Sequence, residues 1–258
     1  MPSRHCRGPT SEAPRGRRWH VGEPEFAGES RGAVPRRLRS PSDRVLRRSR
    51  RDRRISSMTA TEPAISVVPA NEASWDDLQA VFGTTGPAAR CQCQRFKLRR
   101  KEYFAGFPAE ARAERLRQQT DIGHPESGTT SGLVAYLDGE PVGWCAVEPR
   151  SHYEGLVRNN RVPWEGRDED KGDDSDWAVT CFVTRRGFRK SGVSRALALA
   201  AVDFARERGA RAIEGYPITT KNVIMEELLV GTVSVFADAG LAVISRPTLR
   251  RVVMRLDF

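Results

Sequence analysis

Residues 177–195 read WAVTCFVTRRGFRKSGVSR and are the most informative part of the chain. The run Trp177–Val183 shows no apolar–polar alternation, which predicts a central strand buried on both faces. A basic loop with two glycines follows at Arg185–Arg195, and a helix opens at its end. Helical spacing places five apolar residues on one stripe of that helix: Val193, Ala196, Leu197, Ala200 and Phe204. Gly209 is expected to end it.

The loop before this helix has the chemistry of an anion site. The first turn of a helix carries free backbone N–H groups and the positive end of the helix dipole. A glycine there, Gly192, lets an anion approach the backbone closely, and Arg189, Lys190 and Arg195 add full positive charges. We therefore expect a pyrophosphate site. Neither nucleotide fingerprint fits, because the chain has no Gly-Lys-Ser/Thr ending a P-loop and no G-x-G-x-x-G.

Strand and helix patterns continue on both sides of this unit. Towards the N-terminus we expect, in order, a short edge strand Ile65–Val68, a helix Trp75–Phe82 capped by Ser74, an irregular segment 84–100, a helix Pro108–Thr120, a β-hairpin of Leu133–Leu137 and Val142–Val147, and a long polar stretch 149–176. Towards the C-terminus we expect the strand Ala212–Tyr216, the helix Thr232–Ala239 and the strands Val243–Ile244 and Arg251–Leu256. This order predicts a mixed α/β fold.

Charge divides the 258 residues into two parts. Residues 1–57 hold sixteen arginines, no lysine and six acids, so they carry the whole net charge of +10. Residues 58–258 hold 27 basic and 27 acidic side chains. No apolar run approaches the roughly 18 residues that a membrane helix needs, and no apolar core marks the Arg-rich start as a secretory signal. Five cysteines in such a chain indicate reduced thiols and a cytoplasmic protein.

Residues 1–57 predict a disordered basic extension, because their few large apolar residues follow no period. The run Arg44–Arg54 could bind nucleic acid by neutralising phosphates, or belong to an organellar presequence, although the acids argue against the latter. A third interpretation is that the segment is not part of the working protein. Met58 precedes the first strand pattern and would make a natural start.

The hexapeptide Arg189-Lys190-Ser191-Gly192-Val193-Ser194 resembles the signature of the GNAT family of acetyl-coenzyme A-dependent N-acetyltransferases. That signature is Arg or Gln, two residues, Gly, one residue, then Gly or Ala. Ser194 departs from it at a position where only close packing is at stake. The strand order across residues 64–258, the hairpin Val134–Val147 and the ending Val235–Leu241 also resemble the family. The resemblance implies a GNAT-type, mostly antiparallel sheet with helices on both faces over residues 58–258, and acetyl-CoA as co-substrate.

The resemblance also implies roles for individual residues. The backbone around Ser191, Gly192, Val193, Ser194 and Arg195 would hold the coenzyme pyrophosphate, with Arg189 beside it. The backbone of Phe182 and Val183 would pair with the pantetheine like an added strand, and an N–H near Phe182 would bond the thioester oxygen.

The residues that would donate and accept protons during the reaction have no motif of their own in this sequence. The family often places a proton-donating Tyr in its last helix, where this chain has Phe236. Tyr216 and Ser234 are the substitute donors. Asp176, Glu148 and Glu214 end strands near the expected cleft and are the candidate bases, each with an ordinary solvated or paired acid as the alternative. His124 and His152 are expected to be loop histidines.

The segment Cys91-Gln92-Cys93-Gln94 lies between the first two expected helices, where family members line the acceptor pocket. Plain packing is the alternative. We expect no metal there, because C-x-C spacing is unusual for structural zinc and Cys145 and Cys181 lie in apolar strands.

The resemblance thus implies an N-acetyltransferase acting on the primary amine of a small molecule or peptide, and we expect a monomer or homodimer without membrane contact. The alternative is a non-catalytic acyl-CoA-binding or nucleic-acid-associated regulatory module. The acceptor is not specified.

The basic extension should be dispensable for folding. A protein that starts at Met58 is expected to keep its melting temperature within a few degrees and to keep its coenzyme affinity, because no apolar period precedes Ile65. Calorimetric melting measures the first quantity and titration the second. Failure of the shortened chain to fold would refute the expectation. If the extension binds nucleic acid, only the full chain will bind DNA, with an affinity that falls steeply with salt.

Overall fold

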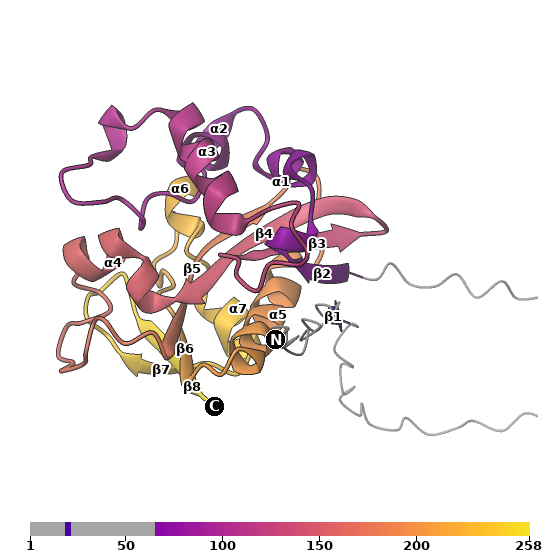
Figure 1. Ribbon diagram of the computed structural model, residues 1–258. Coiled ribbons are helices and arrows are strands. Elements are labelled where there is room, and N and C mark those ends of the chain that lie inside the picture. The colour runs from indigo at the N-terminus through magenta and orange to yellow at the C-terminus, as the bar shows by residue number, and fades with distance from the viewer. Residues whose placement is uncertain (1–18, 22–64) are drawn as a thin grey trace, which may run out of the picture.

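The computed structural model describes residues 19–21 and 65–258, which form one eight-stranded sheet with helices on both faces (Figure 1). The strand order is β1-β2-β3-β4-β5-β6-β8-β7. The strands are β1 (Trp19–Val21), β2 (Ile65–Pro69), β3 (Leu133–Leu137), β4 (Glu140–Pro149), β5 (Asp176–Thr184), β6 (Ala212–Gly215), β7 (Ala242–Ser245) and β8 (Val253–Asp257). Only β5 and β6 pair in parallel, so the expected mostly antiparallel sheet is confirmed.

The start of the chain differs from the expectation in one respect. The segment Ile65–Val68 was expected to be an edge strand, but β1 pairs with β2 on the side away from β3. Trp19–Val21 therefore has regular structure where none was expected. The prediction of disorder for the rest of residues 1–57 falls on 1–18 and 22–57, which lie outside the described residues.

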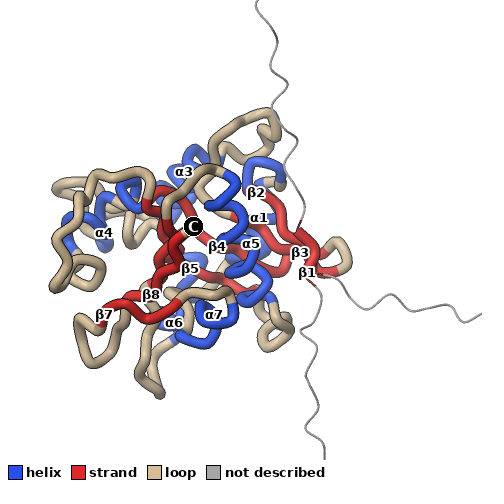
Figure 2. Tube along the Cα trace, turned by 90° about the horizontal axis from the view of Figure 1, so that it is seen from below, coloured by secondary structure: helices blue, strands red, loops and turns tan. Residues whose placement is uncertain are grey.

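The helices form a layer on each face of the sheet (Figure 1). They are α1 (Trp75–Phe82), α2 (Gly86–Cys91), α3 (Ala109–Thr120), α4 (Glu154–Asn159), α5 (Val193–Glu207), α6 (Met225–Leu228) and α7 (Val233–Asp238). One core cluster packs α5 and α7 against the sheet, and a second packs α1 and α3 against its other face. Figure 2, seen from the side of α5, shows this helix in front of the central strands. No helix among the described residues has the length and apolarity needed to cross a membrane.

Local sequence explains most of these elements. The Ser74 side chain accepts a hydrogen bond from the Asp77 N–H at 3.1 Å, which caps α1 as expected. The strands at Trp177–Val183 and in the hairpin, the long helix of the central unit and the last helix also lie where the patterns predicted them. The helices α2, α4 and α6 were missed, because each has only four to six residues and none shows a full apolar period.

The strands β5 and β6 separate part-way along the sheet. Their pairing runs from Asp176–Ala212 to Val179–Gly215 and stops there, although β5 continues to Thr184. The ring of Phe236 in α7 lies against Gly215, where an added Cβ would come within 2.3 Å of the ring. A bulge in the β4–β5 ladder between Ala146 and Val147 falls at the same level. The sheet is therefore continuous at one end of β5 and divided at the other.

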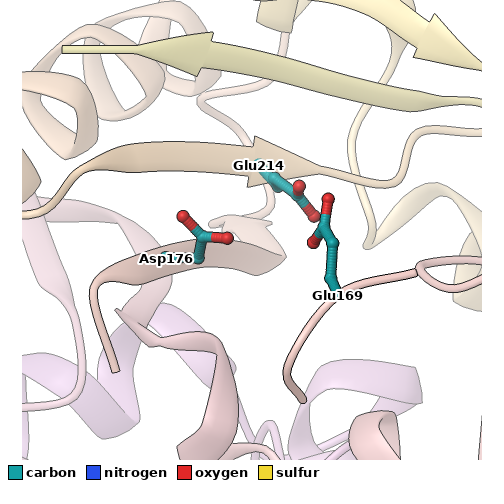
Figure 3. A group of neighbouring side chains, drawn as sticks. All are labelled: Glu169, Asp176 and Glu214. Atoms are coloured by element: carbon teal, nitrogen blue, oxygen red, sulfur yellow. The ribbon is translucent and has the colours of Figure 1, made fainter. Parts of the chain in front are cut away.

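A partly buried cluster of charges joins the strands at the continuous end, and Figure 3 shows its three carboxylates. Its members are Arg150, Arg167, Arg211 and Arg255 around Glu169, Asp176 and Glu214. The Arg150 guanidinium donates to Asp176 and to Glu214 at 3.1 Å. Arg255 on β8 reaches the same two carboxylates at 3.1 Å and 2.9 Å. The cluster thus joins β5, β6 and β8 to the long polar stretch after β4.

The surrounding guanidinium groups keep these carboxylates ionised. Burial acts to raise the pKa of Asp176, but hydrogen bonds from Arg255 and Arg211 outweigh it, and the pKa lies below its usual value. The pKa of Glu214 is lowered in the same way, against its burial, by Arg167 and Arg150. Because these pKa values are depressed in the folded state, the cluster stabilises the protein above about pH 4 and loses that contribution as the pH falls further.

The variant Asp176→Asn should destabilise the fold by about 3–5 kcal/mol, because it leaves buried arginines without their carboxylate. Urea unfolding at pH 7 measures this loss. As a matched control, Asp203→Asn removes the exposed partner of Arg206 and should change stability by less than about 0.5 kcal/mol. Normal stability together with lost catalysis would instead support the catalytic role that the sequence suggested for Asp176.

Candidate functional site

A groove of about 760 Å³ opens where β5 and β6 separate, and is called the β5 groove below. Its walls are the end of β5 (Phe182–Thr184), the basic loop with Arg189 and Lys190, the α1–α2 segment 80–88, and α6 with the residues that follow it. A smaller hollow of about 250 Å³, the α5 hollow, adjoins it and shares Thr184, Lys190, Ser194 and Val235 with it. Gly192, Val193 and Arg195 also line the α5 hollow.

Backbone N–H groups without partners gather at the start of α5. Among the described residues, no acceptor lies within hydrogen-bond distance of the N–H groups of Ser191, Gly192 or Val193. Gly192 is the N-cap residue and has φ +80°, a left-handed conformation that favours glycine. An added Cβ at Gly192 would find only Ile65, at 3.9 Å, so the space beside it is open. The glycine is needed for its backbone conformation as well as for its small size.

The basic side chains of the loop differ in how they are held. Arg195 pairs with Asp238 of α7 at 2.5 Å, so it joins two helices and its charge is partly neutralised. Arg189 and Lys190 are exposed, line the β5 groove, and have no carboxylate partner among the residues that the structure describes. The free positive charge is therefore on the groove side of the loop.

Ser194 fits where the family signature has Gly or Ala. Its hydroxyl lies 3.2 Å from the Thr184 hydroxyl, which connects the start of α5 to the end of β5. The departure from the signature therefore adds a polar contact between the strand and the helix of the central unit.

The backbone donors of β5 differ from those expected. The Phe182 N–H points into the gap between β5 and β6, but it donates to the Leu229 carbonyl at 2.6 Å. The alternation of an antiparallel ladder turns the Val183 N–H towards Trp144 on β4, so Val183 does not supply a donor to the gap. Thr184 N–H points to the same side as Phe182 N–H and has no acceptor among the described residues. Sequence reasoning missed Thr184, although the register of a strand indicates such a donor once one neighbour is known.

The two residues expected to be catalytic lie outside both hollows. Tyr216 is buried and its hydroxyl donates to Glu214 at 2.9 Å. Burial, and then the charge of Glu214, raise the pKa of the Tyr216 hydroxyl well above its usual value. Asp176 is fully buried in the arginine cluster at the opposite end of β5. These contacts favour structural roles for both residues.

The remaining proton-transfer candidates also have clear positions. Phe236, in place of the family's Tyr, is buried with its ring 5.6 Å from the ring of Phe182, and Ser234 is exposed in the α5 hollow. Glu148 is buried at the end of β4, ion-paired with the buried Lys97 and 3.7 Å from Nδ1 of the half-exposed His152. A hydrogen bond with Glu148 raises the pKa of His152. Neither Glu148 nor His152 lines the β5 groove.

The segment Cys91–Gln94, expected to line the acceptor pocket, does not line either of the two hollows. All four residues are buried. Gln92 exchanges side-chain hydrogen bonds with Gln79 at 3.2 and 3.3 Å. Gln94 donates to Gln119 at 2.8 Å. The alternative of plain packing fits these contacts better, since they bind the segment to α1 and α3.

The four thiols of this region pack together without forming a compact ligand set. Cys93 accepts a hydrogen bond from the Trp144 indole at 2.9 Å. A hydrogen bond with Cys93, followed by burial, raises the pKa of Cys181, and burial raises the pKa of Cys145 and Cys91. In the described part of the chain, the one His, Cys, Asp or Glu group close enough to hold an ion is Glu169, Asp176 and Glu214. Those three carboxylates (Figure 3) are already bound by arginines, so their surroundings do not fit a cation.

Several solved structures are similar to this chain. The GNAT domain of S. lividans PAT is 17% identical, with a TM-score of 0.43 over 76% of this chain and 91% of that one. A GCN5-related N-acetyltransferase from Kribbella flavida is 18% identical, with a TM-score of 0.42 over 75% and 98%. The paia N-acetyltransferase from Thermoplasma acidophilum, solved with coenzyme A, is 14% identical, with a TM-score of 0.41 over 75% and 99%.

Among curated proteins nothing matches the chain. Residues 94–228 match the acetyltransferase (GNAT) family, and this match includes the separated strands, the basic loop and the start of α5. The chain therefore belongs to the acetyltransferase (GNAT) family.

Proposed function

We propose that this protein transfers an acetyl group from acetyl-CoA to a primary amine by direct attack of the amine on the thioester. The observation that carries the proposal is the row of N–H groups at Ser191–Val193, which have no partner among the described residues and lie beside the free charges of Arg189 and Lys190. A row of backbone donors at a helix start, with cations on one side, suits a pyrophosphate.

The β5 groove supplies the second part of a coenzyme site. It extends from the basic loop along the end of β5, where Thr184 offers a backbone N–H. Pantetheine has two amide groups along its chain, and these can pair with the backbone of such a strand edge as an added strand does. Bonded to a backbone N–H, the thioester oxygen would be stabilised as it gains negative charge during attack.

The amine has to lose a proton before or during attack. An alkylamine with a pKa near 10.4 is about 3.4 units from neutrality at pH 7, equivalent to about 4.6 kcal/mol. All three carboxylates considered are buried and ion-paired, Asp176 and Glu214 with arginines and Glu148 with Lys97, and none lines the β5 groove. We therefore favour loss of this proton through desolvation of the amine in the site over its transfer to one of these carboxylates.

A non-catalytic coenzyme-binding module is the second candidate. The specific observation in its favour is Phe236, which leaves the last helix without a hydroxyl near Phe182. Both candidates require a working coenzyme site, and they differ in whether thiol is released when an amine is added.

The variant Gly192→Asp should lose coenzyme binding while the protein remains folded. Two like charges about 4 Å apart repel by roughly 4 kcal/mol at an effective dielectric of 20, which corresponds to nearly a thousandfold in affinity. Because Gly192 has φ +80°, the substitution also costs about 1 kcal/mol of stability. The matched control is Gly192→Asn, which has the same size and the same backbone cost without the charge. Calorimetric titration with acetyl-CoA should show a large loss of affinity for the Asp variant and a small one for the Asn variant. Equal affinities of the two variants would mean that the pyrophosphate does not bind at this loop.

Thiol release in the presence of a panel of amines tests catalysis directly. Wild-type protein with acetyl-CoA is expected to release free thiol faster with at least one class of amine than without any. The panel should include polyamines, amino acids, aminoglycosides and peptide N-termini. Coenzyme binding without amine-dependent thiol release in every class would favour the non-catalytic module.

A further inference from the structure

The gap between β5 and β6 is occupied by a segment of the chain itself. The Leu229 carbonyl accepts the Phe182 N–H at 2.6 Å. Two residues later, Gly231 O accepts from Ile218 N at 3.4 Å, and Ile218 forms a parallel bridge with Thr232. Residues 224–232, called the strap below, therefore run between the free end of β5 and the segment that follows β6.

The strap also fills the side-chain space of the gap. An added Cβ at Gly231 would lie 2.9 Å from the ring of Phe236 and 3.0 Å from the ring of Phe182. Met225, Leu228 and Leu229 form one wall of the β5 groove. The strap thus takes up both the backbone donor and the apolar surface at the point where the strands separate.

The strap is held in place from outside by two ion pairs. Glu226 pairs with Arg90 of α2 at 3.1 Å, and Glu227 pairs with Arg250 at 2.7 Å. The arginine side chains are 63% and 54% exposed, so each pair contributes little. Ile224 is 63% exposed, and Met225 and Leu228 are also exposed, whereas Val230 is buried and Leu229 packs against the second core cluster. The first half of the strap is thus held mainly by weak exposed contacts, and opening it requires the release of Leu229 and Val230.

We propose that the strap is a self-made occupant of the coenzyme track, closed on the Phe182 N–H by the Leu229 carbonyl, and that coenzyme binding requires it to open. The proposal rests on the proposed function, because it assumes that the coenzyme lies in the β5 groove. It explains why the N–H expected to bond the thioester oxygen is already taken. The apparent dissociation constant then equals the intrinsic one divided by the fraction of molecules with an open strap.

The sign of a charge substitution tests this closure. Arg90→Gln and Arg250→Gln each remove a positive charge, which by electrostatics alone should weaken the binding of an anionic coenzyme. Because each substitution also breaks a pair that closes the strap, we expect tighter binding instead, by about twofold each and roughly fourfold together. Calorimetric titration with coenzyme A measures the affinities, and hydrogen exchange at the Phe182 amide should become faster in the double variant without coenzyme. The matched control is Arg206→Gln, whose partner Asp203 lies on the same helix away from the strap, and its affinity should not rise.

The outcomes separate this proposal from the proposed function. Tighter binding in the arginine variants, with faster exchange at Phe182, supports the strap. Wild-type binding combined with unchanged or weaker binding in the double variant overturns the strap and leaves the proposed function standing. If neither the wild-type protein nor the double variant binds coenzyme A, both the strap proposal and the proposed function are overturned.

Discussion

The parallel pairing of β5 and β6 ends after Val179 and Gly215, and the rest of the site depends on that early ending. In an unbroken sheet the N–H groups of Phe182 and Thr184 would be used by a neighbouring strand. Here the Phe236 ring stands beside Gly215 and the strands separate, so the backbone of β5 is left facing a groove. The basic loop follows directly after β5, and therefore brings its N–H groups and charges to the same groove.

Such a gap needs a firm anchor at the other end of the strands. The arginine–carboxylate cluster provides it, since it ties β5, β6 and β8 to the segment after β4. Buried charges that bind one another are poor candidates for chemistry, because their protonation is fixed by their partners. The two ends of β5 therefore differ in their contacts. At Asp176 the charge is paired within the protein, whereas at Thr184 the backbone N–H has no acceptor among the described residues.

The sequence predicted the parts of the fold that have a period or a cap. The apolar run of β5, the stripe of α5 and the cap at Ser74 are local signals, and the structure has these elements where expected. The surroundings of Asp176 and Tyr216 could not be predicted in this way. Strand ends can be located from sequence, but Asp176 meets three arginines from separate segments, and the Tyr216 hydroxyl donates to Glu214. The same limit applies to Cys91–Gln94, whose burial depends on Gln79 and Gln119. The position of the strap could not be predicted from the sequence, because a hydrogen bond between a backbone carbonyl and a backbone N–H leaves no characteristic pattern of side chains.

The contact between Gly215 and Phe236 also limits how this sequence can vary. A methyl group at position 215 has no room while a phenyl ring is at position 236, because the added carbon would lie 2.3 Å from the ring. A smaller residue at 236 would free that volume, so the effects of changes at the two positions should not add. The two side chains share one volume between a strand and a helix, although their positions are about twenty residues apart in sequence. Related chains with a side chain at the first position should therefore carry a smaller ring, or none, at the second.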